Sequence, residues 1–371
     1  MYEFVDHSAL RSELLIQTLD EEHVDAVIRL LGEAFGTTRG LPQMMASSDV
    51  LADAYLGVLE RALLRHGYAL ARYADDFRVL APDWGTANQI IELAAEVARG
   101  IGLVLSSEKT SIKKASKIAD EQAEHQEILD KYFTAARADL ASFDELMDWY
   151  GEPVEGEVPD EETAMNEAFR RVLKAWTKRK QGLSIPTPLV SKALRSLRSA
   201  PDRVSDKTLS QLVFLDPLKL SSVILYLRAR LDETEQNWRT TAQLAAMKRQ
   251  SPWAKLWILS YCADLPYDDQ SKYSRRLLRW AKSQLDDEHE VVRAEAAWTL
   301  AQWDALSERQ VSHLFGSATA ITRAGIAAAW GRTGAMPSAP LSKAISGASP
   351  VYADAFSWGG DQRAGDAQPA S

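Results

Sequence analysis

Hydrophobic residues recur at helical spacing along most of the chain, and they predict a mainly helical protein with one short β-hairpin. Residues 8–35 carry leucine, valine and isoleucine at intervals of three and four positions. Residues 48–65 show the same spacing, and Ser48 or Asp49 is the expected cap of that helix. Residues 86–102 form a third amphipathic run that ends at a pair of glycines.

The stretch between the second and third helices changes from helical to alternating spacing. Tyr68, Leu70 and Arg72 alternate with Ala69, Ala71 and Tyr73, and apolar residues resume at 77–80 after two adjacent aspartates. This pattern predicts a β-hairpin with its turn at residues 74–76. Residues 103–112 predict a short strand, a turn and another strand.

The second half of the chain predicts charged and then short helices. Proline, glycine and acidic residues at 151–162 are typical of an exposed loop, and the sequence "SIPTP" at 184–188 marks an expected domain boundary. Alanine, serine, glycine and proline dominate residues 336–371, for which we expect a mostly disordered tail.

Two helical stretches resemble each other. Residues 291–303 align with residues 320–332, which places Arg293 over Arg323, and residues 252–263 are a weaker copy. Each has a polar lead, a basic residue, and then alanine, aromatic and leucine residues on one helical face. The pattern resembles HEAT-like repeats, in which helix pairs bury their apolar faces by stacking on their neighbours.

Composition limits the functional classes. The net charge of −9 argues against a chain coated in positive charge for nucleic-acid binding, although a local basic groove remains open. The single cysteine, Cys262, excludes an internal disulfide framework and is expected as a small core residue in a reducing cytoplasm. Because no apolar run is long enough to span a bilayer and no signal peptide is evident, we expect no membrane association.

The paired aspartates, Asp75 and Asp76, are the main candidate for chemistry. Neighbouring carboxylates at a hairpin turn project into the same solvent space and offer hard oxygen ligands for Mg²⁺. Two Mg²⁺ ions held in this way can activate a primer 3′-hydroxyl and stabilise the leaving pyrophosphate. The alternative is an ordinary exposed turn, and the four residues 73–76 taken alone favour that alternative.

Three blocks in order resemble reverse transcriptases. They are "RGLPQMMASSDVLADAYL" (39–56), "RYADDFRV" (72–79) and "GLVLSSEKTSI" (102–112). The resemblance covers about residues 1–118. It implies a palm-type RNA-directed DNA polymerase that uses Mg²⁺, an RNA template, a DNA primer and dNTPs.

The resemblance also implies roles for single residues. Asp75 and Asp76 would be the catalytic, metal-binding carboxylates, with Asp75 favoured as the direct ligand. The nucleotide- and template-binding set would be Tyr2, Gly40, Leu41, Pro42, Gln43, Tyr73 and Lys109. Within it, Tyr2 would match the aromatic that blocks a ribose 2′-hydroxyl, and Lys109 would lie near the nucleotide phosphates. The alternatives are a simple turn at 40–42, a core position for Tyr73 and a solvated charge at Lys109.

Two departures from the family pattern matter. Met44 stands where the family usually has glycine, and the spacing places the family's third catalytic aspartate upstream of Met1. Asp6 is expected as a cap or surface charge, and His7 as a structural residue. We therefore expect an N-terminally incomplete reverse transcriptase, of the bacterial group II intron, retron or abortive-infection lineage, with little activity from this polypeptide alone.

The expected fold is an α+β partial palm, with a short antiparallel sheet and helices, followed by an all-α HEAT-like repeat domain. The expected parts are a partial palm at 1–118, a charged helical connector at 119–183, helical repeats at 184–335 and the tail at 336–371. Bacterial antiviral reverse transcriptases are similar in plan, which implies a role in antiviral defence.

A basic helix near the expected boundary is a candidate for contact with a nucleic-acid backbone. Its residues are Arg170, Arg171, Lys174, Lys178 and Arg179, with Trp176 available for stacking. The alternative is a solvated helix whose tryptophan packs inward, and the acidic remainder of the helical region also fits a protein partner. A second function class therefore stands beside the enzyme: an inactive palm on a helical scaffold that binds a partner.

Overall fold

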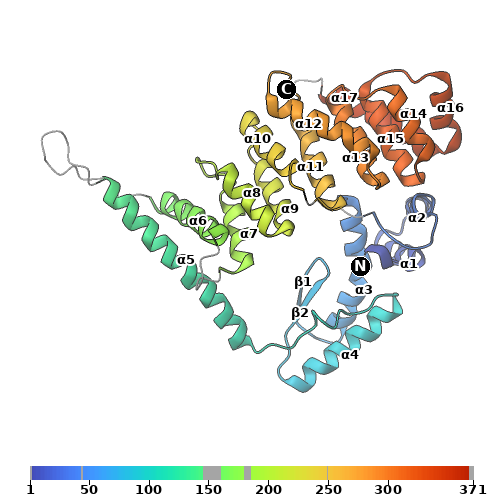
Figure 1. The fold of residues 1–371 in the computed structure, drawn as a ribbon. Coiled ribbons are helices and arrows are strands. Elements are labelled where there is room, and N and C mark those ends of the chain that lie inside the picture. The colour runs from blue at the N-terminus through green and yellow to red at the C-terminus, as the bar shows by residue number, and fades with distance from the viewer. Residues whose placement is uncertain (1, 43–44, 145–159, 179–184, 249, 367–371) are drawn as a thin grey trace, which may run out of the picture. The chain divides into compact units, whose positions relative to one another are not determined.

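The computed structural model describes residues 2–42, 45–144, 160–178, 185–248 and 250–366. Helices predominate in these residues, and the described sheet is a single antiparallel pair of strands. The chain divides into two compact units, residues 1–115 and 116–371 (Figure 1). None of the helices in the described residues combines the length and the apolar character that crossing a membrane requires.

Unit 1, residues 1–115, carries the hairpin and four α-helices. Its elements are η1 (Tyr2–Phe4), α1 (His7–Thr18), α2 (Glu21–Phe35), α3 (Ala46–Arg65), β1 (Leu70–Tyr73), β2 (Asp76–Val79) and α4 (Trp84–Gly100). The predicted helical run at 8–35 is thus two helices, because Leu19 adopts a left-handed conformation (φ 56°) and Asp20 caps α2. The cap predicted for the next helix was wrong: α3 begins at Ala46, so Ser48 and Asp49 lie inside its first turn.

Helix α3 connects two small hydrophobic cores. Its first half packs Ala52 and Tyr55 into a cluster with residues of η1, α1 and α2. Its second half packs Leu59 and Leu63 against Ile90 of α4 and the inner face of the hairpin. The hairpin therefore packs against two helices, α3 and α4. An isolated two-stranded hairpin is only marginally stable in water, so this packing stabilises it.

The strands predicted at residues 103–112 are absent. This segment follows α4 as unpaired chain and contains a turn in which Ser106 O accepts hydrogen bonds from the amides of Lys109 and Thr110. Leu103 and Leu105 do pack against the two cores of unit 1, whereas Val104 is 86% exposed. The alternation of apolar residues in this segment therefore reflects the burial of every second side chain and does not indicate a β-strand.

Unit 2 consists of helices from the boundary onward. They are α5 (Ala115–Asp144), α6 (Glu161–Lys178), α7 (Thr187–Ser196), α8 (Asp206–Leu215), η2 (Pro217–Lys219), α9 (Leu220–Arg228), α10 (Thr234–Ala245), α11 (Pro252–Asp264), α12 (Lys272–Ser283), η3 (Gln284–Asp286), α13 (Glu290–Gln302), α14 (Glu308–Ser317), α15 (Ala320–Thr333), α16 (Ala339–Ala348) and α17 (Pro350–Asp366). Serine caps help to define their starts, because the hydroxyls of Ser205, Ser251 and Ser271 accept backbone N–H groups of α8, α11 and α12.

Consecutive helix pairs of unit 2 stack in two rows. In one row α7, α9, α11, α13, α15 and α17 each pack on the next, and in the other α6, α8, α10 and α12 do the same (Figure 1). The three similar sequence stretches are α11, α13 and α15, so they are neighbours in one row. The aligned arginines also have matching roles: Arg293 donates to the carbonyls of Asp287 and Glu288, and Arg323 donates to the carbonyl of Phe315.

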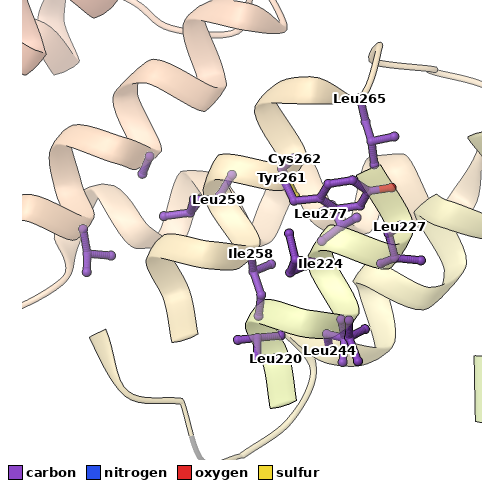
Figure 2. Close-up of a cluster of buried hydrophobic side chains, with 14 of the residues drawn as sticks. Leu220, Ile224, Leu227, Leu244, Ile258, Leu259, Tyr261, Cys262, Leu265 and Leu277 are labelled. Carbon is purple, nitrogen blue, oxygen red and sulfur yellow. The ribbon is translucent and has the colours of Figure 1, made fainter. Parts of the chain in front are cut away.

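One continuous hydrophobic core runs through the stacked helices of unit 2. Figure 2 shows the part where Ile224 and Leu227 of α9 meet Ile258 and Tyr261 of α11. Cys262 is fully buried in this region, and burial raises the pKa of its thiol. The prediction of a core cysteine is confirmed.

The predicted disorder of residues 336–371 was wrong for the described residues, because residues 339–366 form α16 and α17. Leu341, Ile345 and Tyr352 are buried, and Tyr352 packs edge-to-face on Phe315. The small residues that mimic a disordered composition let α17 approach α15 closely. Residues 367–371 lie outside the described residues.

The predicted boundary at 184–188 does not separate compact units. Helix α6, before it, packs against α7 and α8, after it. The observed division at residue 115 instead lies close to the predicted end of the first part at residue 118. The coarser expectation, a short antiparallel sheet with helices followed by an all-helical region, is confirmed.

Candidate metal-binding hairpin

The paired aspartates lie at the tip of the β1–β2 hairpin, as predicted. Leu70 pairs with Val79, Arg72 with Phe77, and Tyr73 with Asp76, which leaves a two-residue turn at Ala74 and Asp75. Ala74 has a positive φ of 52°, a conformation that two-residue hairpin turns favour at their first position and that alanine adopts at a cost. The predicted turn was one residue too long, since Asp76 is the first residue of β2.

The two faces of the hairpin differ in burial. Leu70, Phe77 and Val79 face inward onto Leu59, Leu63 and the residues of α4, whereas Ala71, Tyr73, Asp76 and Arg78 face solvent. The inward set is apolar, and this burial fixes the register, because a slip of one residue would turn it to the solvent.

Arg72 is the one charged side chain on the inner face, and it holds the hairpin to α3. Its guanidinium pairs with Asp53 Oδ1 at 2.7 Å and with Glu60 Oε2 at 2.8 Å. Its Nη1 also donates to the carbonyl of Ala74 at 3.2 Å, so the same side chain braces the turn. Only 11% of the side chain is exposed, which strengthens both pairs relative to surface ion pairs.

Asp75, Asp76 and Tyr73 form the solvent-exposed part of the hairpin tip. Tyr73 is 84% exposed and stands directly opposite Asp76 on the outer face. Asp75 lies in the turn beside them, and both carboxylates are exposed. The alternative of a core position for Tyr73 is therefore excluded.

Tyr2 lies in the electrostatic field of this tip. Its hydroxyl donates to Asp49 Oδ1 of α3 at 2.5 Å. That hydrogen bond, burial, and the charges of Asp49 and Asp75 raise the pKa of Tyr2 to about 12. Tyr2, Asp49 and Asp75 thus come from three separate elements into one neighbourhood, and Asp49 was assigned only a capping role by the sequence.

The segment at 40–42 is held by backbone bonds to the N-terminal residues. Gly40 donates to Val5 O at 2.9 Å and Leu41 donates to Tyr2 O at 3.0 Å. Gly40 has a φ of 106°, a conformation that favours glycine. Leu41 is buried in the core of α1, α2 and α3, so its side chain shapes the fold, and Pro42 beside it is half-buried. Gln43 lies outside the described residues.

The remaining candidates of unit 1 have local roles. Lys109 is exposed in the turn after α4, and its amide donates to Ser106 O. Asp6 caps α1, accepting hydrogen bonds from the amides of Ser8 and Ala9. His7 is buried, with Nε2 at 2.8 Å from Gly40 O. The predictions of a cap and of a structural histidine are confirmed.

The hairpin offers two carboxylates, the kind of ligand that Mg²⁺ prefers. Asp75 and Asp76 offer exposed hard oxygen ligands on a braced turn. Across the described part of the chain, no three aspartate, glutamate, histidine or cysteine side chains form a group that could hold a metal ion. In the described residues the hairpin tip therefore presents two neighbouring exposed carboxylates, Asp75 and Asp76.

The basic helix α6 differs from the predicted phosphate-tracking face. Arg170 pairs with Glu167 and Asp202, and Arg171 pairs with Glu167 at 2.9 Å. Lys174 and Lys178 are exposed one turn apart, and Trp176 packs against the hydrophobic core. Arg179 lies outside the described residues. The arginine charges of this face are thus already neutralised in part.

Comparison with known proteins adds no relative, since no family model, no curated protein and no solved structure matches the chain.

Proposed function

We propose that the chain is an RNA-directed DNA polymerase by lineage, in which Asp75 and Asp76 bind Mg²⁺ for two-metal nucleotidyl transfer. Unit 1 is then part of a polymerase palm, and unit 2 a HEAT-like scaffold of the kind joined to palms in bacterial antiviral systems. The observation that carries the proposal is the hairpin. It brings Asp75, Asp76 and Tyr73 together at an exposed tip. The resemblance to reverse transcriptases puts the metal-binding hairpin in this same block, residues 72–79.

The chain's own residues supply support for such a site. Arg72 braces the turn against α3, so the two carboxylates start from a fixed backbone. Tyr2, held by Asp49, occupies the neighbourhood of Asp75, where the resemblance puts an aromatic that meets the nucleotide sugar. Mg²⁺ bound at this tip would activate the primer 3′-hydroxyl and stabilise the leaving pyrophosphate.

A primer-extension assay with an RNA template, a DNA primer, dNTPs and Mg²⁺ tests the proposal. The full chain is compared with Asp75→Asn/Asp76→Asn and with a matched control, Asp268→Asn/Asp269→Asn, which alters an adjacent pair in unit 2. Low but measurable extension that only the hairpin variant loses supports the enzyme. Equal signals from the wild type and the hairpin variant contradict it.

A second candidate is a non-catalytic binding module, in which a degenerate palm is joined to a helical scaffold. In the described residues no three acidic, histidine or cysteine side chains form a group that could hold a metal ion, and the stacked helices make up the larger unit. The same assay separates the two candidates, because a binding module gives no extension that depends on Asp75 and Asp76.

A further inference from the structure

The exposed face of α12 carries the densest positive charge in the described helices of unit 2. Its cations define the α12 stripe: Lys272, Arg275, Arg276, Arg279 and Lys282. All five side chains are exposed, while Ser274, Leu277 and Ala281 on the opposite face are fully buried. The stripe occurs in a chain whose 52 acidic residues outnumber its 43 basic ones, so an excess of carboxylates was available to neutralise it.

The stripe has no carboxylate partner in the part of the chain that the structure describes. Other arginines of unit 2 are paired: Arg203 with Glu233 at 2.5 Å, and Arg228 with Asp264 at 2.7 Å. Three acidic residues near the ends of α12 make other contacts. Asp268 and Asp269 accept hydrogen bonds from Gln270, and Asp287 pairs with Lys255.

The spacing of the stripe repels its own members. Apart from the adjacent Arg275 and Arg276, its cations follow one another at three or four residues, which places neighbours of like charge on one helical face over about 15 Å. Like charges at this spacing destabilise an isolated helix. The helix dipole favours only Lys282, which lies in the last turn of α12, whereas a polyanion lying along the helix would convert the repulsions into attractions.

The stripe fits a phosphate backbone better than a membrane or a protein. Membrane-surface helices insert apolar side chains beside their cations, but Tyr273, Leu278 and Trp280 of α12 pack against the core. Protein interfaces centre on exposed aromatic side chains, and the α12 stripe contains none. A row of lysine and arginine without base-reading aromatics matches sequence-independent binding of phosphates.

We propose that the α12 stripe binds the phosphate backbone of a nucleic acid. This site lies on the helical unit, so it extends the proposed function without depending on catalysis at the hairpin. It also assigns backbone binding to α12 in place of α6, where Arg170 and Arg171 are already paired.

Fluorescence anisotropy of a labelled oligothymidylate, with the full chain in EDTA and over a series of NaCl concentrations, tests the site. Arg275→Gln/Arg279→Gln removes two phosphate contacts. The slope of log K against log [salt] should therefore become shallower by about 1.4, and affinity near physiological salt should fall roughly tenfold. The control Lys192→Gln/Arg195→Gln removes the same charge from exposed positions of α7 and should leave both values unchanged.

Three results would overturn the proposal: an unchanged slope for the α12 variant, equal losses in the α12 and α7 variants, or preferential binding of phosphatidylserine vesicles or polyglutamate over the oligonucleotide. Circular dichroism of both variants checks that the helices are intact. Because the measurement excludes Mg²⁺ and dNTPs, a chain that fails in primer extension still gives a decisive result here.

Discussion

Glu295 is a carboxylate that the fold holds away from water without pairing it. It lies half-buried on α13, and in the described residues its side chain makes no hydrogen bond or ion pair. Loss of hydration raises its pKa from 4.5 to about 7, Arg228 on α9 opposes the rise, and Asp264 on α11 adds to it. Replacement by glutamine keeps the shape and removes the charge.

The direction of the pH dependence of stability follows from whether the folded or the unfolded chain holds the Glu295 proton more tightly. The folded chain keeps Glu295 protonated to higher pH than the unfolded chain, so the full stability is present below pH 4.5 and is lost as pH rises to about 7. At 1.36 kcal/mol for each pKa unit, the loss is at most about 3 kcal/mol. Glu295→Gln should therefore gain up to about 3 kcal/mol over the wild type between acidic and mildly alkaline pH.

Urea unfolding followed by tryptophan fluorescence measures this difference, because every tryptophan except Trp84 lies in the sequence of unit 2. The matched control is Glu127→Gln, at an exposed position of α5. The free energy of unfolding of the control should follow the wild type at each pH. Parallel pH profiles for Glu295→Gln and the wild type would refute the assignment of a desolvated, unpaired carboxylate.

Two pairs of glycine substitutions test the fold, each by urea unfolding followed by circular dichroism. Gly40→Ala should cost about 1–3 kcal/mol because its φ is 106°, whereas Gly32→Ala in the last turn of α2 should gain about 0.5–1 kcal/mol. Equal effects would contradict the backbone argument. Gly359→Ala should cost about 1–3 kcal/mol because its Cβ would overlap the carbonyl of Ala328, whereas Gly347→Ala meets no atom. A tolerated Gly359→Ala would contradict the close approach of α15 and α17.

The hairpin could be predicted from the sequence because all of its signals are local. Alternation over 68–73, a turn without large side chains, and resumed alternation from Phe77 specify both strands and their inner face. The repeat of α13 and α15 was also predictable, since each copy carries its own core residues and its own arginine.

The support of the site could not be predicted in this way. Asp49 meets Tyr2 across 47 positions of sequence, and Arg72 finds its carboxylates on α3. Neither pairing has a periodic signal, because one depends on how α3 packs against η1 and the other on how α3 packs against the hairpin. The prediction of a disordered tail was wrong for a different reason. A composition of small residues is compatible both with disorder and with the close helix contact at Gly359.

The most direct test of the central claim is whether Mn²⁺, used in place of Mg²⁺, binds at the hairpin tip. In a chain labelled with ¹⁵N-tyrosine, Mn²⁺ should broaden the amide signal of Tyr73 before that of Tyr267, which precedes the adjacent pair Asp268–Asp269. Asp75→Asn/Asp76→Asn should abolish this preference. Equal broadening of Tyr73 and Tyr267, or a preference that survives the double substitution, would contradict a metal site at Asp75 and Asp76.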